Sequence, residues 1–316
     1  MGGTAASGGA GGNPDSTSRC GSQAALKGAQ WTKTNWPADN SYFDLVAADD
    51  VVLARTWDSL NGGRVFVTTD DGASWTQSSA ADTDIDILSI VLLSGNNILA
   101  STWGNSYRFT SSGKTWDAMS PSGITADTAI RSMASIDLVL FAGTTGDIYK
   151  SSDSGNTWTE VKTGLPADAT IFSIAGSGDT VFAGTDTGGV FVMKNGGVGW
   201  AAANSGLTDL HISQLTLVGP RLFAVTLNGV FLSGDSATSW APDTSTIQGV
   251  NGYLVLNDQL LAGTDADGAY FSSDGGTSWS PLGSGLPDGT RIWSLAAGRT
   301  SLYAGTDSGV WRASCE

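Results

Sequence analysis

A seven-bladed, all-β propeller with four-stranded blades is the fold that this sequence predicts, and three observations predict it. A motif of the form Ser-x-Asp-x-Gly-x-Thr-Trp recurs along the chain with a period near forty residues. An aromatic residue stands nine positions before each motif tryptophan, and an Ala-Gly-Thr-like segment precedes most of these aromatics. The last copy breaks off at the C-terminus, while a matching fourth strand stands near the N-terminus. A repeat of about forty residues with four short strands has the length of one propeller blade.

The motif copies are interpreted as scaffold. In each copy we expect the aspartate to accept hydrogen bonds from nearby backbone N–H groups and the glycine to adopt a conformation that other residues resist. The tryptophan is expected to cover the hairpin with its apolar face. The copies ending at Trp75, Trp158 and Trp279 are clear, and those ending at Trp116, Trp200 and Trp240 are weaker.

The seventh blade is predicted to combine both ends of the chain. Trp311 occupies its aromatic position, and the chain then stops before a fourth strand can form. Trp31-Thr32-Lys33 matches the fourth strand of the internal repeats, so the N-terminal strand completes this blade and leaves no open edge. Cys315 falls on the aspartate position of the same blade, and Cys20 shortly precedes the completing strand. We therefore expect a Cys20–Cys315 disulfide, with a pair of free buried thiols as the alternative.

Charge and hydropathy narrow the possible partners. Lys and Arg number 15 against 30 acidic residues, for a net charge of -15, which argues against nucleic acid and against an anionic membrane surface. No apolar run approaches the length of a membrane helix, so we expect no direct membrane insertion. We also expect a monomer.

The first nineteen residues differ in composition from the rest. Residues 1–19 are rich in Gly, Ala and Ser and are interpreted as a flexible linker before a propeller at residues 20–316. The segment resembles the tether that follows the lipidated cysteine of a bacterial surface lipoprotein, with a plain disordered tail as the alternative. With the expected disulfide, it predicts an extracytoplasmic protein: a bacterial cell-surface lipoprotein, or a periplasmic or secreted protein.

The motif and its spacing resemble those of the Asp-box (bacterial neuraminidase repeat) β-propellers, over about residues 20–316. The seven-bladed members that it looks like include photosystem II assembly-factor-like propellers, sortilin-type ectodomains and the propellers of xyloglucan-cleaving glycosidases. The resemblance implies that the ligand face carries the loop leading into each innermost strand and the loop between the second and third strands. The motif turns lie on the opposite face. Fold analogy does not settle function.

Positions where the seven copies differ on that face are the candidate binding residues. Aromatic residues and arginines gather there on blades seven, one, two and three, and a histidine and three aspartates occupy other variable positions: Trp293, Phe43, Trp57, Trp103, Arg131, Arg291, His211, Asp186, Asp265 and Asp307. Flat aromatic faces and fork-shaped donors suit sugars or extended peptides. We predict a binding or assembly module that recognises glycan or protein on its aromatic rim. Packing between blades is the alternative for these residues.

The residues available for catalysis favour a non-enzymatic protein. The chain has one histidine, His211, no Gly-x-Ser-x-Gly elbow and two glutamates, Glu160 and Glu316. We expect no cofactor and no metal, and the acidic clusters Asp82–Asp86 and Asp265–Gly268 are interpreted as solvated loops. Sialidase activity and a photosystem-assembly role are not predicted. The alternative function is a glycoside hydrolase that uses two aspartates, with these candidates: Asp44, Asp86, Asp186, Asp265 and Asp307.

Overall fold

The structure is a computed structural model. It describes residues 20, 22–37, 43–48, 50–58, 62–80, 87–93, 97–110, 115–125, 127–194, 197, 199–245 and 247–315. The fold is the predicted seven-bladed all-β propeller with four-stranded antiparallel blades. The chain divides into two compact units: the first holds Ile87–Thr110 and Trp116–Asp243, and the second holds Asn13–Asp86, Ser111–Thr115 and Thr244–Glu316. No helix of the described chain is long and apolar enough to cross a membrane.

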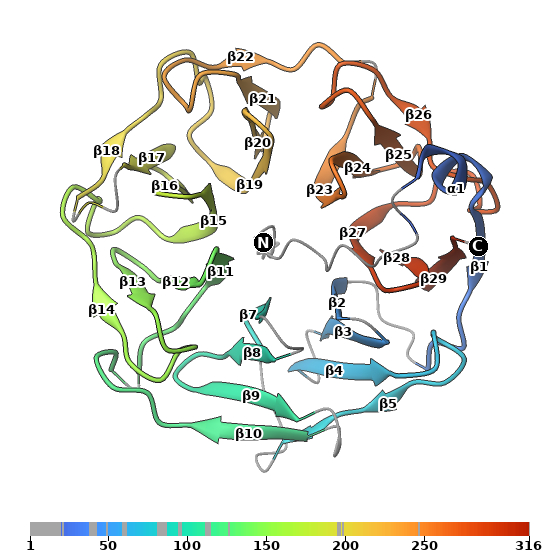
Figure 1. Cartoon of the computed structure of the whole chain (residues 1–316), viewed down its shortest axis with the longest axis horizontal. Coiled ribbons are helices and arrows are strands. Elements are labelled where there is room, and N and C mark those ends of the chain that lie inside the picture. Colours follow the sequence, from blue (N-terminus) through green and yellow to red (C-terminus); the bar gives the residue numbers. More distant parts are fainter. Residues whose placement is uncertain are drawn as a thin grey trace. The chain divides into compact units, whose positions relative to one another are not determined.

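The first unit contains blades two to five, and the strands of each blade lie side by side in chain order (Figure 1). Blade two is β7 (Ser89–Leu92), β8 (Ile98–Ser101), β9 (Ser106–Thr110) and β10 (Thr115–Met119). Blade three is β11 (Ser132–Ile136), β12 (Val139–Gly143), β13 (Ile148–Ser151) and β14 (Thr159–Glu160). Blade four is β15 (Ile171–Ser177), β16 (Thr180–Thr185), β17 (Val190–Met193) and β18 (Ala201–Ala202). Blade five is β19 (Ile212–Val218), β20 (Arg221–Thr226), β21 (Gly229–Ser233) and β22 (Ala241–Pro242).

The second unit contains blades six, seven and one, with one short helix, α1 (Gln23–Gly28). Blade one is β2 (Phe43–Ala48), β3 (Val51–Asp58), β4 (Gly62–Thr68) and β5 (Thr76–Gln77). The short β6 (Ser79–Ala80) follows β5 in the chain but is not a strand of this sheet. Blade six is β23 (Val250–Leu256), β24 (Gln259–Thr264), β25 (Ala269–Ser272) and β26 (Ser280–Pro281). Blade seven is β27 (Ile292–Ala297), β28 (Ser301–Thr306) and β29 (Gly309–Ser314), completed by β1 (Gln30–Lys33).

The motif turns form closed sets of hydrogen bonds. In blade three, the Ser151 hydroxyl donates to Asp153 Oδ1 at 2.7 Å, and the Gly155 N–H donates to the Ser151 hydroxyl at 2.9 Å. The N–H and hydroxyl of Thr157 donate to the two oxygens of Asp153 at 2.8 and 2.7 Å. Equivalent bonds form around Asp70, Asp235 and Asp274. The scaffold interpretation of the motif is consistent with this geometry.

The copy that ends at Trp240 makes this full set of bonds, although the sequence suggests a weaker copy. Ala237 occupies its glycine position with φ +63°, the left-handed conformation that glycine adopts at the same position of blade three, where Gly155 has φ +84°. The Ala237 N–H donates to the Ser233 hydroxyl at 2.9 Å. The bonds depend on the hydroxyls and the carboxylate, so an alanine in a strained conformation is tolerated.

Acid is expected to weaken these turns. The bonds from Thr157, backbone first, lower the pKa of Asp153 to about 2, and equivalent bonds lower the pKa values of Asp70, Asp235 and Asp274 to about 2. A carboxylate with a lowered folded pKa stabilises the fold above its unfolded pKa of 3.8, and this contribution is lost as the pH falls towards 2.

We predict that Asp153→Asn lowers stability at pH 6, and that the difference from the wild type shrinks between pH 4 and pH 2. Asparagine cannot titrate, and its amide offers one acceptor where the carboxylate offers two oxygens. Urea unfolding of both proteins across this pH range measures the difference. An Asp168→Asn control, at an aspartate outside the motif, should show no such convergence. A difference that does not change with pH would contradict the assigned role of the carboxylate.

A second column of glycines supports packing between consecutive blades, and the sequence analysis did not identify it. Trp200 of blade four donates its backbone N–H to the Thr163 carbonyl of blade three at 2.7 Å. The next residue, Gly164, has φ +95°, and a Cβ there would overlap the Trp200 carbonyl. The same close approach recurs at three further glycines: Gly123, Gly206 and Gly285. These positions require glycine for its conformation and for its lack of a side chain.

Gly164→Ala should therefore destabilise the protein by about 2–3 kcal/mol, because it combines left-handed strain with a backbone clash. Gly178→Ala is the matched control, since Gly178 has φ +55° and a Cβ at this position would meet only open space. The control should cost only about 1 kcal/mol, from conformation alone. Equal losses in urea unfolding would show that the approach to Trp200 is unimportant.

The two ends of the chain meet in blade seven, as predicted. Strand β1 pairs antiparallel with β29, from Gln30 opposite Ser314 to Lys33 opposite Trp311, and both lie near the C-terminus in Figure 1. Trp31 is buried and donates its indole N–H to the Leu282 carbonyl at 2.8 Å. The N-terminal strand thus takes the place of a fourth strand.

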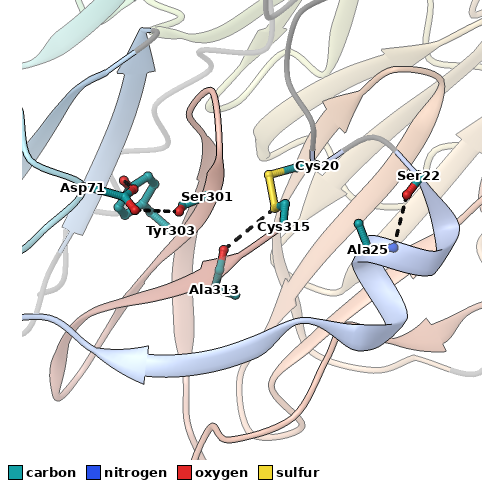
Figure 2. Close-up of a disulfide and its surroundings, with 8 residues drawn as sticks. All are labelled: Cys20, Ser22, Ala25, Asp71, Ser301, Tyr303, Ala313 and Cys315. Atoms are coloured by element: carbon teal, nitrogen blue, oxygen red, sulfur yellow. Dashed lines mark hydrogen bonds between the residues drawn. A yellow bond between two sulfur atoms is a disulfide. The ribbon is translucent and has the colours of Figure 1, made fainter.

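The predicted disulfide is present. Cys20 and Cys315 are bonded and buried, with the bond beside α1 and the end of β29 (Figure 2). The two cysteines are 295 residues apart in the sequence, so the bond restricts nearly the whole unfolded chain. In the chain-entropy account, a loop of this length contributes about 5 kcal/mol.

We predict that the Cys20→Ser/Cys315→Ser double variant loses about 3–5 kcal/mol of unfolding free energy. Denaturant unfolding of the oxidised wild type and the variant measures this loss. The wild type with reductant serves as control and should match the variant. Mass spectrometry should show the wild type gaining the mass of two hydrogen atoms on reduction, and a wild type already reduced as purified would refute the bond.

Candidate functional site

The candidate site lies on the rim, which we define as the loop leading into the first strand of each blade and the loop between its second and third strands. Antiparallel pairing places these loops at one end of each sheet and the motif turn at the other. Apolar side chains stand between the variable rim positions, and those of the first unit are buried: Ile87, Ile130, Ile171 and Ile212. In the second unit Ile292 is buried and Val250 is half-buried. The buried column anchors the rim loops and leaves the flanking side chains to form a site.

Trp103 and Arg131 form one contact on the rim of the first unit. Trp103 follows β8 in blade two, and 52% of its surface is exposed. Arg131 leads into β11 of blade three, and its guanidinium lies 4.2 Å from the centroid of the Trp103 ring. Partial burial lowers the pKa of Arg131. The pair places a cation on a broad, accessible aromatic ring.

Blades three to five supply the other rim residues of the first unit. Asp186 accepts a hydrogen bond from the Thr170 N–H at 2.8 Å, so its carboxylate orders the loop that leads into β15. The His211 ring makes a tilted contact with Phe172, with centroids 5.6 Å apart. Two leucines of blade five, Leu210 and Leu227, are exposed on the same rim. These leucines were not selected from the sequence, because they have no aromatic or charged group to distinguish them.

The rim of the second unit holds a connected group of polar residues and one tryptophan. Arg291 lies 4.9 Å from the Trp293 ring centroid, and its Nε is 3.0 Å from Asp265 Oδ1. The Trp293 indole N–H donates to Asp307 Oδ1 at 2.7 Å, and Asn251 donates to Asp265 Oδ1 at 3.0 Å. The structure thus brings four of the predicted site residues together. Both aspartates are engaged within this group.

The remaining candidates differ in their surroundings. The side chains of Phe43 and Trp57 lie outside the part of the chain that the structure describes, as does the whole of Asp86. Asp44 is buried, and Arg55 Nη2 lies 3.6 Å from its Oδ2, which gives it a structural partner inside blade one. The predicted arc across blades seven, one, two and three is therefore described as two separate groups, one in each unit.

Metal-binding groups were also sought. Among the described residues, no three His, Cys, Asp or Glu side chains are grouped so that they could hold a metal ion. The cluster Asp82–Asp86 lies outside the described residues. In the other acidic cluster, the Asp267 N–H donates to the Thr264 hydroxyl at 3.0 Å, a local bond of the β24–β25 loop.

Comparisons with known proteins support the propeller fold. The chain matches the family described as the DUF6242 beta propeller domain over residues 88–215. No curated protein matches it.

Several solved propellers resemble the chain in fold. The structure described as YCF48 bound to D1 peptide has a TM-score of 0.68 and 14% identity, covering 90% of this chain and 96% of that one. The extracellular domain of BT4673 from B. thetaiotaomicron has a TM-score of 0.66 and 18% identity, covering 90% and 39%. AFV00434, an ancestral GH74 enzyme, has a TM-score of 0.66 and 17% identity, covering 89% and 45%. At these identities the likeness is one of fold.

Proposed function

We propose that this chain is an extracytoplasmic Asp-box propeller that binds glycan or protein through its rim. The observation that carries the proposal is the exposure of Trp103 with Arg131 stacked against it. Motif tryptophans such as Trp158 and Trp240 are buried and belong to the scaffold, whereas Trp103 exposes half of its surface on a rim loop. An exposed tryptophan beside an arginine is typical of binding surfaces.

The proposed location rests on the disulfide and on the N-terminal composition. A buried disulfide is typical of oxidising compartments outside the cytoplasm. The solved neighbours also include an extracellular domain, that of BT4673. We propose residues 1–19 as a linker that tethers a monomeric propeller, residues 20–316, as a surface lipoprotein or leads into a periplasmic or secreted domain.

The solved propellers and the rim aspartates help to choose between the two candidate functions, ligand binding and glycoside hydrolysis. One neighbour is described as bound to a peptide, which supports a propeller rim as a binding surface. Another is a GH74 enzyme, but the described aspartates of this chain favour no hydrolytic pair. Asp186 accepts a backbone N–H, Asp265 pairs with Arg291 and Asp307 accepts the Trp293 indole N–H. We therefore propose binding alone.

Trp103→Ala should weaken binding about tenfold or more for ligands identified on a glycan array and a peptide array, because an exposed aromatic anchor is lost. Leu138→Ala is the matched control. Leu138 is 83% exposed but lies in the β11–β12 turn, at the opposite end of the sheet from the rim. Trp293→Ala tests the rim of the second unit in the same assay. Unchanged binding by both tryptophan variants would overturn the proposal.

A further inference from the structure

We infer that Arg131 and Trp103 form a subsite for the carboxylate of an extended peptide that also carries apolar side chains. The inference rests on the proposed binding function and names its ligand. It is carried by the incomplete surroundings of Arg131, by the exposure of Trp103 and by the apolar side chains elsewhere on the rim of the first unit.

Arg131 is incompletely bonded. Its Nε is buried and has no hydrogen-bond partner, and among the described residues no carboxylate forms an ion pair with it. The buried Nε is out of a ligand's reach, so a ligand would have to contact the terminal N–H groups of the guanidinium. These groups match a carboxylate, which accepts two parallel hydrogen bonds. A ligand carboxylate there would supply the charge partner that the described residues do not.

The second rim arginine provides an internal comparison. Arg291 also lies on a tryptophan, at 4.9 Å from the Trp293 centroid, and its Nε likewise makes no hydrogen bond, but the Asp265 carboxylate forms an ion pair with it at 3.0 Å. The same combination of arginine and tryptophan is therefore neutralised in the second unit. In a chain of net charge -15, a rim cation without an acidic partner is a specific feature, and it favours an anionic ligand at Arg131.

Trp103 orients the guanidinium and leaves room for a ligand. The cation lies 4.2 Å from the ring centroid, which restricts its motion without using its N–H donors. Because Trp103 remains 52% exposed, part of the indole can contact an apolar group attached to the carboxylate. The pair thus offers an ionic contact and an apolar contact side by side.

Aliphatic side chains on the same unit favour a peptide over an acidic glycan. Leu210 and Leu227 are 40% and 67% exposed, and both lie in rim loops of blade five. With Trp103, they are three of the four large hydrophobic residues that are exposed in the described chain. Sugars stack on aromatic rings, whereas leucines contact apolar peptide side chains. Phe172, at the start of β15 in blade four, contacts His211, which precedes β19 of blade five.

The test uses synthetic heptapeptide libraries with free C-termini, and the same libraries amidated and depleted of Asp and Glu. The full chain should bind peptides with a carboxylate and leucine-like side chains, and binding should fall when the carboxylates are removed. Arg131→Gln should weaken the selected peptides about tenfold or more. Arg131→Lys keeps the charge but loses the fork, so it should bind with intermediate affinity.

Arg108→Gln is the control for net charge. Arg108 lies on β9 and donates to the Ser154 carbonyl at 3.1 Å, away from the rim loops. It should bind the selected peptides as the wild type does. Raising the salt concentration should weaken the wild type more than Arg131→Gln, because the variant lacks the ionic contact. Unfolding midpoints of all variants show whether each is folded.

Several results would overturn the inference. The inference fails if the wild type binds no peptide of the libraries. It also fails if the wild type and Arg131→Gln bind acidic peptides equally, or if the wild type binds the amidated, acid-depleted peptides as well as the original ones. Binding of oligogalacturonate but not of peptides, lost in Arg131→Gln, would assign the subsite to an acidic glycan and refute the peptide. If Trp103→Ala weakens an array ligand while Arg131→Gln does not, the inference fails and the proposed function stands. If none of Trp103→Ala, Arg131→Gln and Trp293→Ala weakens the binding of any ligand, the inference and the proposed function both fail.

Discussion

The pairing of β1 with β29 is the constraint on which the blade architecture depends. Without this strand, blade seven would have three strands and an exposed edge at β29. The disulfide holds the chain just before β1, and Asp71 of blade one adds a polar contact. Asp71 accepts hydrogen bonds from the Tyr303 and Ser301 hydroxyls (Figure 2). It also forms an ion pair with Arg312 at 3.0 Å. Burial, and then the bond to Asp71, raises the pKa of Tyr303, so the phenol stays protonated as a donor.

The two ends of each sheet differ in how completely their polar groups are bonded. At the motif end, an aspartate such as Asp153 accepts bonds at both oxygens from residues within four positions in the chain. At the rim, Arg131 lies on Trp103, and no described carboxylate pairs with it. A saturated turn stabilises the fold and offers little to a ligand, whereas a charged group without a partner can be paired by a ligand. The proposed function therefore lies where the repeats differ.

Much of the fold and part of the candidate site could be predicted from the sequence. The period and the truncated last copy predicted seven blades, the completing strand at Trp31 and the bond between Cys20 and Cys315, and the structure agrees. Judging motif copies by residue identity was less successful, because Ala237 adopts the conformation expected of glycine and its copy is complete. The glycines that approach the next blade, such as Gly164, were missed because their constraint comes from a backbone about forty residues away.

The sequence by itself determined the features that act over short distances along the chain or repeat at a fixed period. The motif bonds link residues within four positions of each other, and the period of a repeat can be read directly from the sequence. Only the tertiary structure decided how the rim arginines differ. Arg131 and Arg291 occupy similar positions, and each lies beside a tryptophan. Arg131 contacts Trp103 of the preceding blade, whereas Arg291 forms an ion pair with Asp265 of the blade before it. The physical reason is that a side chain's charge partner is set by the neighbouring blade's backbone, which brings together residues that are distant in the chain.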